Sequence, residues 1–285
     1  MASLLEKIDT LIDESSDPRV RNWFLLGSPF PTLIIIALYL VTVMWILPAY
    51  MKDRKPFKLT KIIRIYNIFQ IISCIVIIYK VFTAGWYQGE YSYTCAPIDY
   101  SDNPNAVKMV SAFYLVYFLK MVELIETVFF VLRKKFNQVS GLHLYHHAST
   151  FFLTYIGCKF IGGGMASMPI MVNSFIHVLM YTYYYLSSLG PGWQKALAPW
   201  KPKLTMAQMI QFVLLIMHAL TALQPGCKVP RQFLLIYLPN VIVIFKMFAD
   251  FYKKTYAKKS PVTEFAKNGV KKNGVQHSHK KSKTT

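Results

Sequence analysis

Seven long apolar runs constrain the fold of this sequence more than any other feature. They lie near residues 32–50, 65–83, 107–132, 142–160, 165–188, 205–223 and 233–252. Each is close to the roughly 20 residues that a helix needs to cross the hydrocarbon core of a bilayer. Only 16% of the 285 residues carry charge, whereas roughly a quarter do in soluble domains. The sequence therefore predicts an all-α integral membrane protein with seven transmembrane helices.

The 32 Lys and Arg residues predict how this protein is oriented in the membrane. Most of them fall in the first, third and fifth connections between the apolar runs and in the segment after Lys253. Positively charged connections remain in the cytosol, so the C-terminus is predicted to be cytosolic and the N-terminus to lie on the opposite side. The net charge of +19 is thus mainly a topology signal, and no nucleic-acid partner is expected.

The chain divides into three predicted regions. Residues 1–28 are predicted to form a lumenal amphipathic segment, in which a short helix lies on the membrane surface because apolar side chains recur at helical spacing at Leu4, Leu5, Ile8, Leu11 and Ile12. Residues 29–253 form the helical domain, and residues 254–285 form a Lys-rich cytosolic tail that is expected to be disordered. Lys281 and Lys283 near the C-terminus resemble a di-lysine retrieval signal, which predicts a multi-pass protein of the endoplasmic-reticulum membrane.

The four cysteines fall into two classes by position. Cys95 and Cys227 lie in the second and sixth connections, which are both predicted to be lumenal. Because that compartment is oxidising, a disulfide between them would join the two connections. Cys74 and Cys158 lie inside apolar runs and are expected to act as small apolar residues.

The third apolar run contains three ionisable residues, which are costly inside a membrane. Lys120, Glu123 and Glu126 follow one another at a spacing of three in the string KMVELIET, so a helix places them on one face. Two interpretations are open. The three residues either form a self-neutralising ladder that packs helices together, or they take a direct part in a functional site.

The fourth run begins with a histidine cluster. His143, His146 and His147 lie on one helical face near the predicted cytosolic end, where they could be metal ligands, acid–base catalysts, a nucleophile with its supports, or an interfacial cluster. Only five of the seven histidines lie in the membrane region, fewer than the His boxes of integral-membrane desaturases use for two irons. A single metal held by three imidazoles remains an alternative, but no bound metal or cofactor is expected.

Two further runs carry polar residues on one helical face. In the fifth run these are Asn173, His177, Met180, Tyr181 and Tyr184. In the sixth run they are Gln208, Gln211 and His218. Interhelical hydrogen bonding is the alternative to a site role for the glutamines.

Four strings in this sequence resemble the motifs of the ELO family of very-long-chain fatty-acid elongases. They are KMVELIET, NQVSGLHLYHH, HVLMYTYYYLSSLGP and LTMAQMIQF, and they occur in the family's order over nearly the whole membrane region. One residue departs from the pattern, since Glu126 stands where the family usually has Asp. Glu keeps the carboxylate group but carries it on a longer side chain than Asp.

The resemblance implies an acyltransferase, a very-long-chain 3-oxoacyl-CoA synthase. Such an enzyme condenses a long-chain acyl-CoA with malonyl-CoA, with loss of carbon dioxide, and its helices enclose a tunnel for the acyl chain. His146 is expected to attack the thioester and form an acyl-imidazole, because no cysteine of this chain is adjacent to a histidine in sequence. The implied partners are the two CoA thioesters and membrane lipid, with a homodimer and the other elongation enzymes as further candidates.

The resemblance also suggests roles for the other residues. His143 and His147, with Glu123 and Glu126, are expected to orient the nucleophile, and His177 and Asn173 are expected to donate hydrogen bonds to the developing oxyanion or enolate. The expected substrate contacts are Lys120, Glu123, Glu126, Tyr181, Tyr184, Lys195, Lys203, Gln208 and Gln211.

Two other functional classes are compatible with several membrane helices. A seven-helix receptor would suit the predicted orientation, but Cys95 and Cys227 join the wrong connections for the usual receptor disulfide. A transporter would need interrupted helices near the membrane midplane, and paired Gly or Pro interruptions in two halves are not visible in the sequence.

Overall fold

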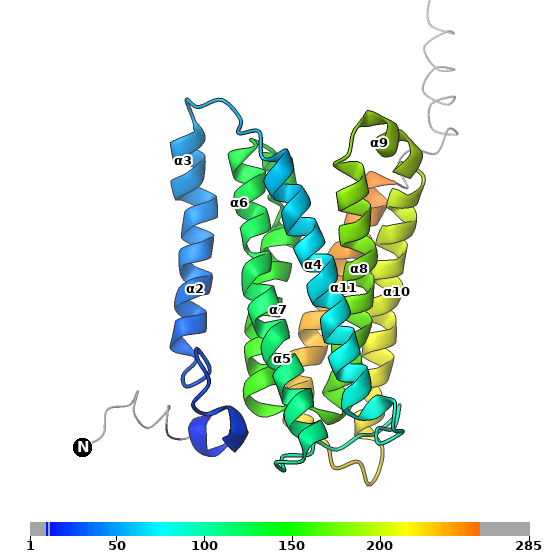
Figure 1. Ribbon diagram of the computed structural model, residues 1–285. Coiled ribbons are helices and arrows are strands. Elements are labelled where there is room, and N and C mark those ends of the chain that lie inside the picture. The colour runs from blue at the N-terminus through cyan, green and yellow to red at the C-terminus, as the bar shows by residue number, and fades with distance from the viewer. Residues whose placement is uncertain (1–9, 11, 257–285) are drawn as a thin grey trace, which may run out of the picture.

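The computed structural model describes residue 10 and residues 12–256, and every regular element within these ranges is a helix (Figure 1). This confirms the predicted all-α class for the described part of the chain. Residues 1–9 and 11, which carry most of the apolar side chains of the predicted membrane-surface helix, lie outside the described residues. So does nearly all of the predicted tail, including its di-lysine-like end.

The long helices stand side by side as a bundle of rods (Figure 1). The first rod consists of α2 (Phe30–Val41), the π-helical η2 (Thr42–Ile46) and α3 (Leu47–Met51), and the second of α4 (Thr60–Val81) and the π-helical η3 (Phe82–Trp86). The third consists of α5 (Pro104–Glu123) and α6 (Ile125–Leu132). The remaining α-helices are α7 (Gly141–Phe160), α8 (Ser167–Ser187), the short α9 (Pro191–Leu197), α10 (Trp200–Leu220) and α11 (Leu234–Thr255). The short 3-10 helices are η1 (Pro18–Val20), η4 (Phe136–Gln138), η5 (Gly164–Ala166), η6 (Thr221–Leu223) and η7 (Arg231–Phe233).

Five helical stretches in the described chain are long and apolar enough to cross a membrane. They are Phe30–Met51, Thr60–Trp86, Gly164–Ser187, Trp200–Leu223 and Arg231–Thr255. The protein is therefore a membrane protein with several spanning helices. The other two predicted spans are helical, as α5–α6 and α7, but they fall outside this set. Both carry ionisable residues of the candidate site, and the count of seven spans stays a prediction.

Large aromatic side chains hold the centre of the bundle together. Tyr117 of α5 stacks on Phe151 of α7, with ring centroids 5.1 Å apart and both side chains buried. The first rod is tied to this centre by a hydrogen bond between Thr32 and Tyr117 (2.8 Å). Its outward residues, among them Leu38 and Trp45, are 60% exposed, as expected for a surface that faces lipid.

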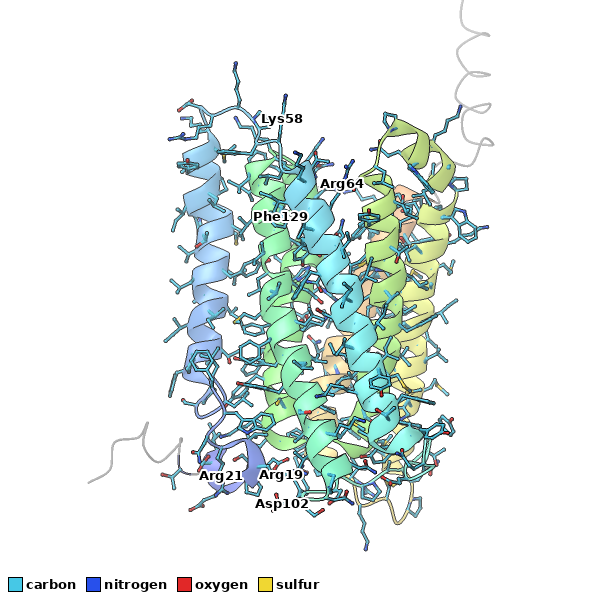
Figure 2. The ribbon with its side chains drawn as sticks, in the orientation of Figure 1. Arg19, Arg21, Lys58, Arg64, Asp102 and Phe129 are labelled. Carbon is cyan, nitrogen blue, oxygen red and sulfur yellow. A yellow bond between two sulfur atoms is a disulfide. The ribbon has the colours of Figure 1, made fainter. Side chains whose placement is uncertain are left out.

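Charged side chains gather at the two ends of the bundle. Figure 2 shows Lys58 and Arg64 at one end, and Arg19, Arg21 and Asp102 at the other. The basic connections after α3 and α6, and the short helix α9, lie at the same end as Lys58. This arrangement agrees with the predicted alternation of connections, while its assignment to cytosol and lumen stays a prediction.

The described part of the N-terminal segment packs against the foot of α7. Val20 and Leu26 are fully buried, and the Asp17 amide donates a hydrogen bond to the Lys159 carbonyl (2.9 Å). The buried Lys159 ammonium donates to Asp13 (3.1 Å), and a buried charge needs such a partner. These residues thus pack against the bundle, while the predicted membrane-surface helix, which rests on Leu4, Leu5, Ile8, Leu11 and Ile12, stays a prediction.

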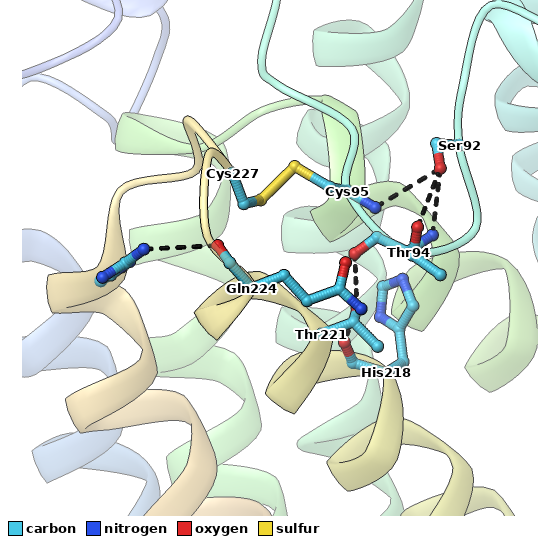
Figure 3. Close-up of a disulfide and its surroundings, with 8 residues drawn as sticks. Ser92, Thr94, Cys95, His218, Thr221, Gln224 and Cys227 are labelled. Carbon is cyan, nitrogen blue, oxygen red and sulfur yellow. Dashed lines mark hydrogen bonds between the residues drawn. A yellow bond between two sulfur atoms is a disulfide. The ribbon is translucent and has the colours of Figure 1, made fainter.

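A disulfide joins Cys95 to Cys227, with Cα atoms 5.9 Å apart, and links the connection after η3 to the connection before α11 (Figure 3). The Thr221 hydroxyl donates a hydrogen bond to the Thr94 carbonyl in the same region. Gly164 has a φ of +52°, and a Cβ there would lie 2.6 Å from the Pro97 carbonyl oxygen. Only glycine lets the start of η5 approach this loop so closely. The loop therefore packs against the ends of α8 and α10.

Candidate active site

A cavity of about 220 Å³ lies between α5, α7, α8, α10 and α11. Its lining is mostly apolar. Seven of the residues singled out in the sequence contribute to it: Lys120, Glu123, His146, Asn173, His177, Gln211 and His218. The structure thus brings together polar groups from four helices at one apolar cavity, which is a common design for a binding or catalytic site.

Glu123 is the most deeply buried charged residue of this group, with no exposed surface. The Lys120 ammonium donates to both of its carboxylate oxygens at 2.9 Å. His177 Nδ1 lies 3.3 Å from Glu123 Oε1. Because a carboxylate paired with a lysine only accepts hydrogen bonds, Nδ1 carries the proton of a neutral His177 ring and leaves Nε2 as an acceptor. Glu123 therefore fixes both the orientation and the tautomer of His177.

His143 ends a chain of hydrogen bonds that starts on the first rod. The Tyr39 hydroxyl lies 2.7 Å from Thr127 Oγ1, which lies 2.8 Å from His143 Nε2. If Tyr39 donates to Thr127 and Thr127 donates to Nε2, each hydroxyl proton has an acceptor. The proton of the neutral His143 ring is then on Nδ1. The first helical rod thus positions a histidine in the first turn of α7.

Glu126 takes a position beside the histidine cluster. Its Oε1 accepts a hydrogen bond from the Tyr66 hydroxyl (3.2 Å), and its Oε2 lies 3.7 Å from His147 Nε2. Glu126, unlike Glu123, is outside the cavity lining. The two carboxylates of KMVELIET therefore have different partners, although their spacing places them on one face.

His146 is the member of the histidine cluster that lines the cavity. Its ring lies 5.4 Å from that of His147, and the rings of His143 and His147 are 4.2 Å apart. On the other side the His146 ring is 6.3 Å from Phe248 of α11. The neighbouring histidines thus pack behind His146, which leaves His146 to face the cavity.

The remaining predicted residues are outside the cavity lining. Tyr181 is fully buried and packs between Tyr66 and His177, at centroid distances of 6.1 and 5.7 Å. The Gln208 amide donates to Met180 Sδ (3.5 Å), which fits the alternative role of joining helices. Tyr184 is 42% exposed.

The two predicted lysine contacts lie at the end of the bundle near α9. Lys195 is in the last turn of α9, and the Lys203 ammonium lies over the Trp200 ring, 4.6 Å from its centroid. Both side chains are exposed. The structure therefore does not place them with the histidine cluster.

Glu126, His143 and His147 offer ligand atoms that lie within 4.8 Å of one another. Two imidazoles and a carboxylate would suit a zinc ion. Hydrogen bonding from Thr127 already satisfies His143 Nε2, and His147 Nε2 faces Glu126. His143 Nε2 is thus already paired, whereas His147 Nδ1 has no hydrogen-bond partner among the described residues, and the absence of a bound metal stays a prediction.

Several residues at the site were missed in the sequence. Tyr39, Tyr66 and Thr127 contact the acidic and histidine residues, and Tyr237 and Asn240 line the cavity. Thr127 ends the string KMVELIET, so its motif was a usable signal. No signal in the sequence pointed to the three tyrosines, because aromatic residues are common throughout this chain and their contacts depend on tertiary packing.

Comparison with known proteins gives consistent matches over most of the chain. A model of the ELO family, described as the GNS1/SUR4 family, matches residues 24–264. The chain is 43% identical to very long chain fatty acid elongase 4 of Homo sapiens over 267 residues, which are 93% of this chain and 84% of that protein. It is 37% identical to very long chain fatty acid elongase 7 of Drosophila melanogaster over 273 residues, 95% of this chain and 82% of that protein. These matches, together with four motifs whose residues meet at or beside one cavity, show that the chain belongs to the ELO family.

Proposed function

We propose that this protein is a very-long-chain fatty-acid elongase, which condenses a long-chain acyl-CoA with malonyl-CoA to a 3-oxoacyl-CoA two carbons longer. The observation that carries the proposal is that His146 lines a mostly apolar cavity together with Lys120, Glu123 and His177. Such a cavity suits an acyl chain whose thioester is held against a nucleophile. The names of the relatives, all very long chain fatty acid elongases, support the same reaction.

In the first half-reaction the unprotonated nitrogen of His146 attacks the thioester carbonyl. A carbon–nitrogen bond forms, the carbon–sulfur bond breaks, and CoA leaves as a thiolate. The proton that the imidazole releases passes to Nε2 of His177, whose Nδ1 faces Glu123, and from there to the thiolate. This contact makes His177 better suited to accept a proton than to act as the hydrogen-bond donor expected from the sequence. Burial of the acyl-imidazole protects it from hydrolysis.

In the second half-reaction malonyl-CoA takes the place of free CoA. Loss of carbon dioxide leaves the electron pair as an enolate, which attacks the acyl carbon. The new carbon–carbon bond forms as the carbon–nitrogen bond breaks, and His146 recovers its proton from the medium. Asn173 lines the cavity one helical turn from His177, so its amide is placed to donate a hydrogen bond to the enolate oxygen.

The other polar groups position this machinery. Tyr39 and Thr127 hold His143, and Tyr66 holds Glu126, whose carboxylate faces His147. These two histidines pack behind His146. Glu126 stands where the family usually has Asp, and its longer side chain fits between its partners in this structure.

The cavity supplies the inner part of the proposed acyl tunnel. Its lining runs from His146 along α7 to Ile161, and reaches Val229 and Pro230 in the loop that the disulfide holds. Fifteen residues of α7 correspond to roughly 22 Å of helix. This length is suited to a long acyl chain. Lys195 and Lys203 lie at the end of the bundle that carries the basic connections, and they remain candidates for contacts with the phosphates of CoA. The proposed location is the endoplasmic-reticulum membrane, with the C-terminus in the cytosol.

A two-stage reaction predicts that CoA is released before malonyl-CoA is present. Purified protein mixed with a long-chain acyl-CoA should release about one free thiol per active site in a rapid burst, because the acyl group moves to His146. A thiol-reactive chromophore measures the burst. Thiol release that begins only after malonyl-CoA is added would contradict the covalent intermediate, and an intact thioester throughout would contradict the enzyme.

Removal of the Tyr39 hydroxyl tests whether the first rod positions His143. Tyr39→Phe leaves the Thr127 hydroxyl free to rotate away from His143, so we expect kcat to fall about five- to ten-fold with little change in KM, in line with about 1 kcal/mol for one buried hydrogen bond. Thr127→Val should lower kcat at least as much as Tyr39→Phe. Steady-state kinetics measure both. Tyr79→Phe, on the exposed side of α4, is the matched control. An equal fall in kcat in that variant would contradict a catalytic role for the hydrogen bonds from Tyr39 through Thr127 to His143.

A further inference from the structure

Polar atoms without partners line the inner half of the cavity, where a saturated acyl chain would lie. His218 of α10 is only 7% exposed, and its Nε2 has no hydrogen-bond partner among the described residues. The buried hydroxyl of Tyr237 and the Nδ2 amide of Asn240, both on α11, are likewise without partners in the described chain. All three residues line the cavity, and the proposed reaction uses none of them.

His218 and Tyr237 lie well below the reacting histidine, whereas the Asn240 side-chain oxygen accepts a hydrogen bond from the hydroxyl of Tyr145, the residue before His146 (2.9 Å). The His146 and Phe248 rings are 6.3 Å apart, and the Phe248 and Phe212 rings are 5.2 Å apart, so the three are at a similar depth. His218 follows Phe212 by six residues on α10, which is roughly 9 Å of helix, and Tyr237 precedes Phe248 by eleven residues, roughly 16 Å. Both are displaced toward the loop that the disulfide closes.

Buried polar atoms without a hydrogen-bond partner are rare in folded proteins, because they lose their bonds to water and gain none in return. A saturated chain has no group that can hydrogen-bond to these atoms, and the double bond of an unsaturated chain is only a weak acceptor. A hydroxyl both donates and accepts. It therefore satisfies an imidazole nitrogen in either tautomer, a phenol and an amide NH₂ alike, which makes it the substituent that best fits this set.

We propose that the inner half of the cavity is a polar subsite for acyl chains that carry a hydroxyl group in their distal half, bound by His218 and Tyr237. The proposal rests on the proposed function only in that an acyl-CoA occupies the cavity. It deepens that function by naming a substrate class, hydroxylated long-chain acyl-CoA, that the reacting histidines cannot distinguish from unsubstituted chains.

Equilibrium binding to the purified full-length protein tests the subsite without turnover. The probes are pairs of long-chain alkyl-CoA thioethers of equal length, which cannot acylate His146, one saturated and one with a hydroxyl, in a series that moves the hydroxyl along the distal half. We expect the hydroxylated chain to bind about ten-fold more tightly at one or two positions of the series. Equal affinities across the whole series would overturn the proposal and leave water as the partner of these groups.

Variants separate the subsite from general effects on folding. His218→Leu and Tyr237→Phe should each reduce the preference for the hydroxylated chain several-fold while the saturated chain binds at least as well. Tyr79→Phe should leave the preference unchanged. A preference that survives both cavity variants would also overturn the assignment. Turnover of the saturated chain is measured separately, so a failure of the elongase reaction and a failure of the subsite give different results.

Discussion

His146→Ala should acquire no acyl group from acyl-CoA and should lose at least about 10³-fold in turnover, because the variant lacks the atom that carries the chain between the two thiols. Intact-mass analysis after incubation with a long-chain acyl-CoA measures the first effect directly. The parent protein should gain the mass of one acyl group. The side chain lines a cavity, so its removal should leave the fold largely intact.

The neighbouring histidines provide the matched comparison. His143→Ala and His147→Ala keep the proposed nucleophile and lose only groups that pack behind it, so both should still gain the acyl mass, at a lower rate. An equal mass gain in His146→Ala would transfer the role of nucleophile to another histidine. A parent protein that never gains mass, yet turns over, would replace the covalent route with a single-step condensation.

The sequence predicted the helices well because bilayer thickness and apolar composition determine them locally. The first predicted span, 32–50, is the helical rod Phe30–Met51, and the last, 233–252, falls within Arg231–Thr255. The short helix α9 was missed, since a helix of seven residues leaves no clear apolar run. The two predicted spans outside the apolar set, α5–α6 and α7, carry the KMVELIET string and the histidine cluster, whose polar side chains face other helices and the cavity instead of lipid.

The site was only partly predictable, because helical spacing gives a face but does not identify a partner. Lys120, Glu123 and Glu126 share a face, yet Glu123 joins Lys120 and His177 while Glu126 faces Tyr66 and His147. The two interpretations left open for this string also prove compatible. Lys120 and Glu123 neutralise each other, and the same pair lines the cavity. The link from Tyr39 to His143 depends on how two distant rods pack, which spacing along the chain does not reveal.

Lys120→Met should be the most destabilising single substitution at the site. It leaves the Glu123 carboxylate, which has no exposed surface, without its cation, and such a loss costs about 3–5 kcal/mol of unfolding free energy. Denaturant titration in detergent, followed by tryptophan fluorescence, measures the change. Lys246→Met, at an exposed lysine of α11, is the matched control and should cost less than about 1 kcal/mol.

The double variant Lys120→Met/Glu123→Leu separates stability from activity. Replacing both members of a buried ion pair by apolar residues of similar volume is often neutral or stabilising, so the double variant should recover most of the stability lost by Lys120→Met. It should remain inactive, because His177 loses the carboxylate that holds its Nδ1 proton and orients its ring. A double variant no more stable than Lys120→Met would show that the pair is needed for packing rather than charge balance. One that recovers full turnover would remove Glu123 from the mechanism.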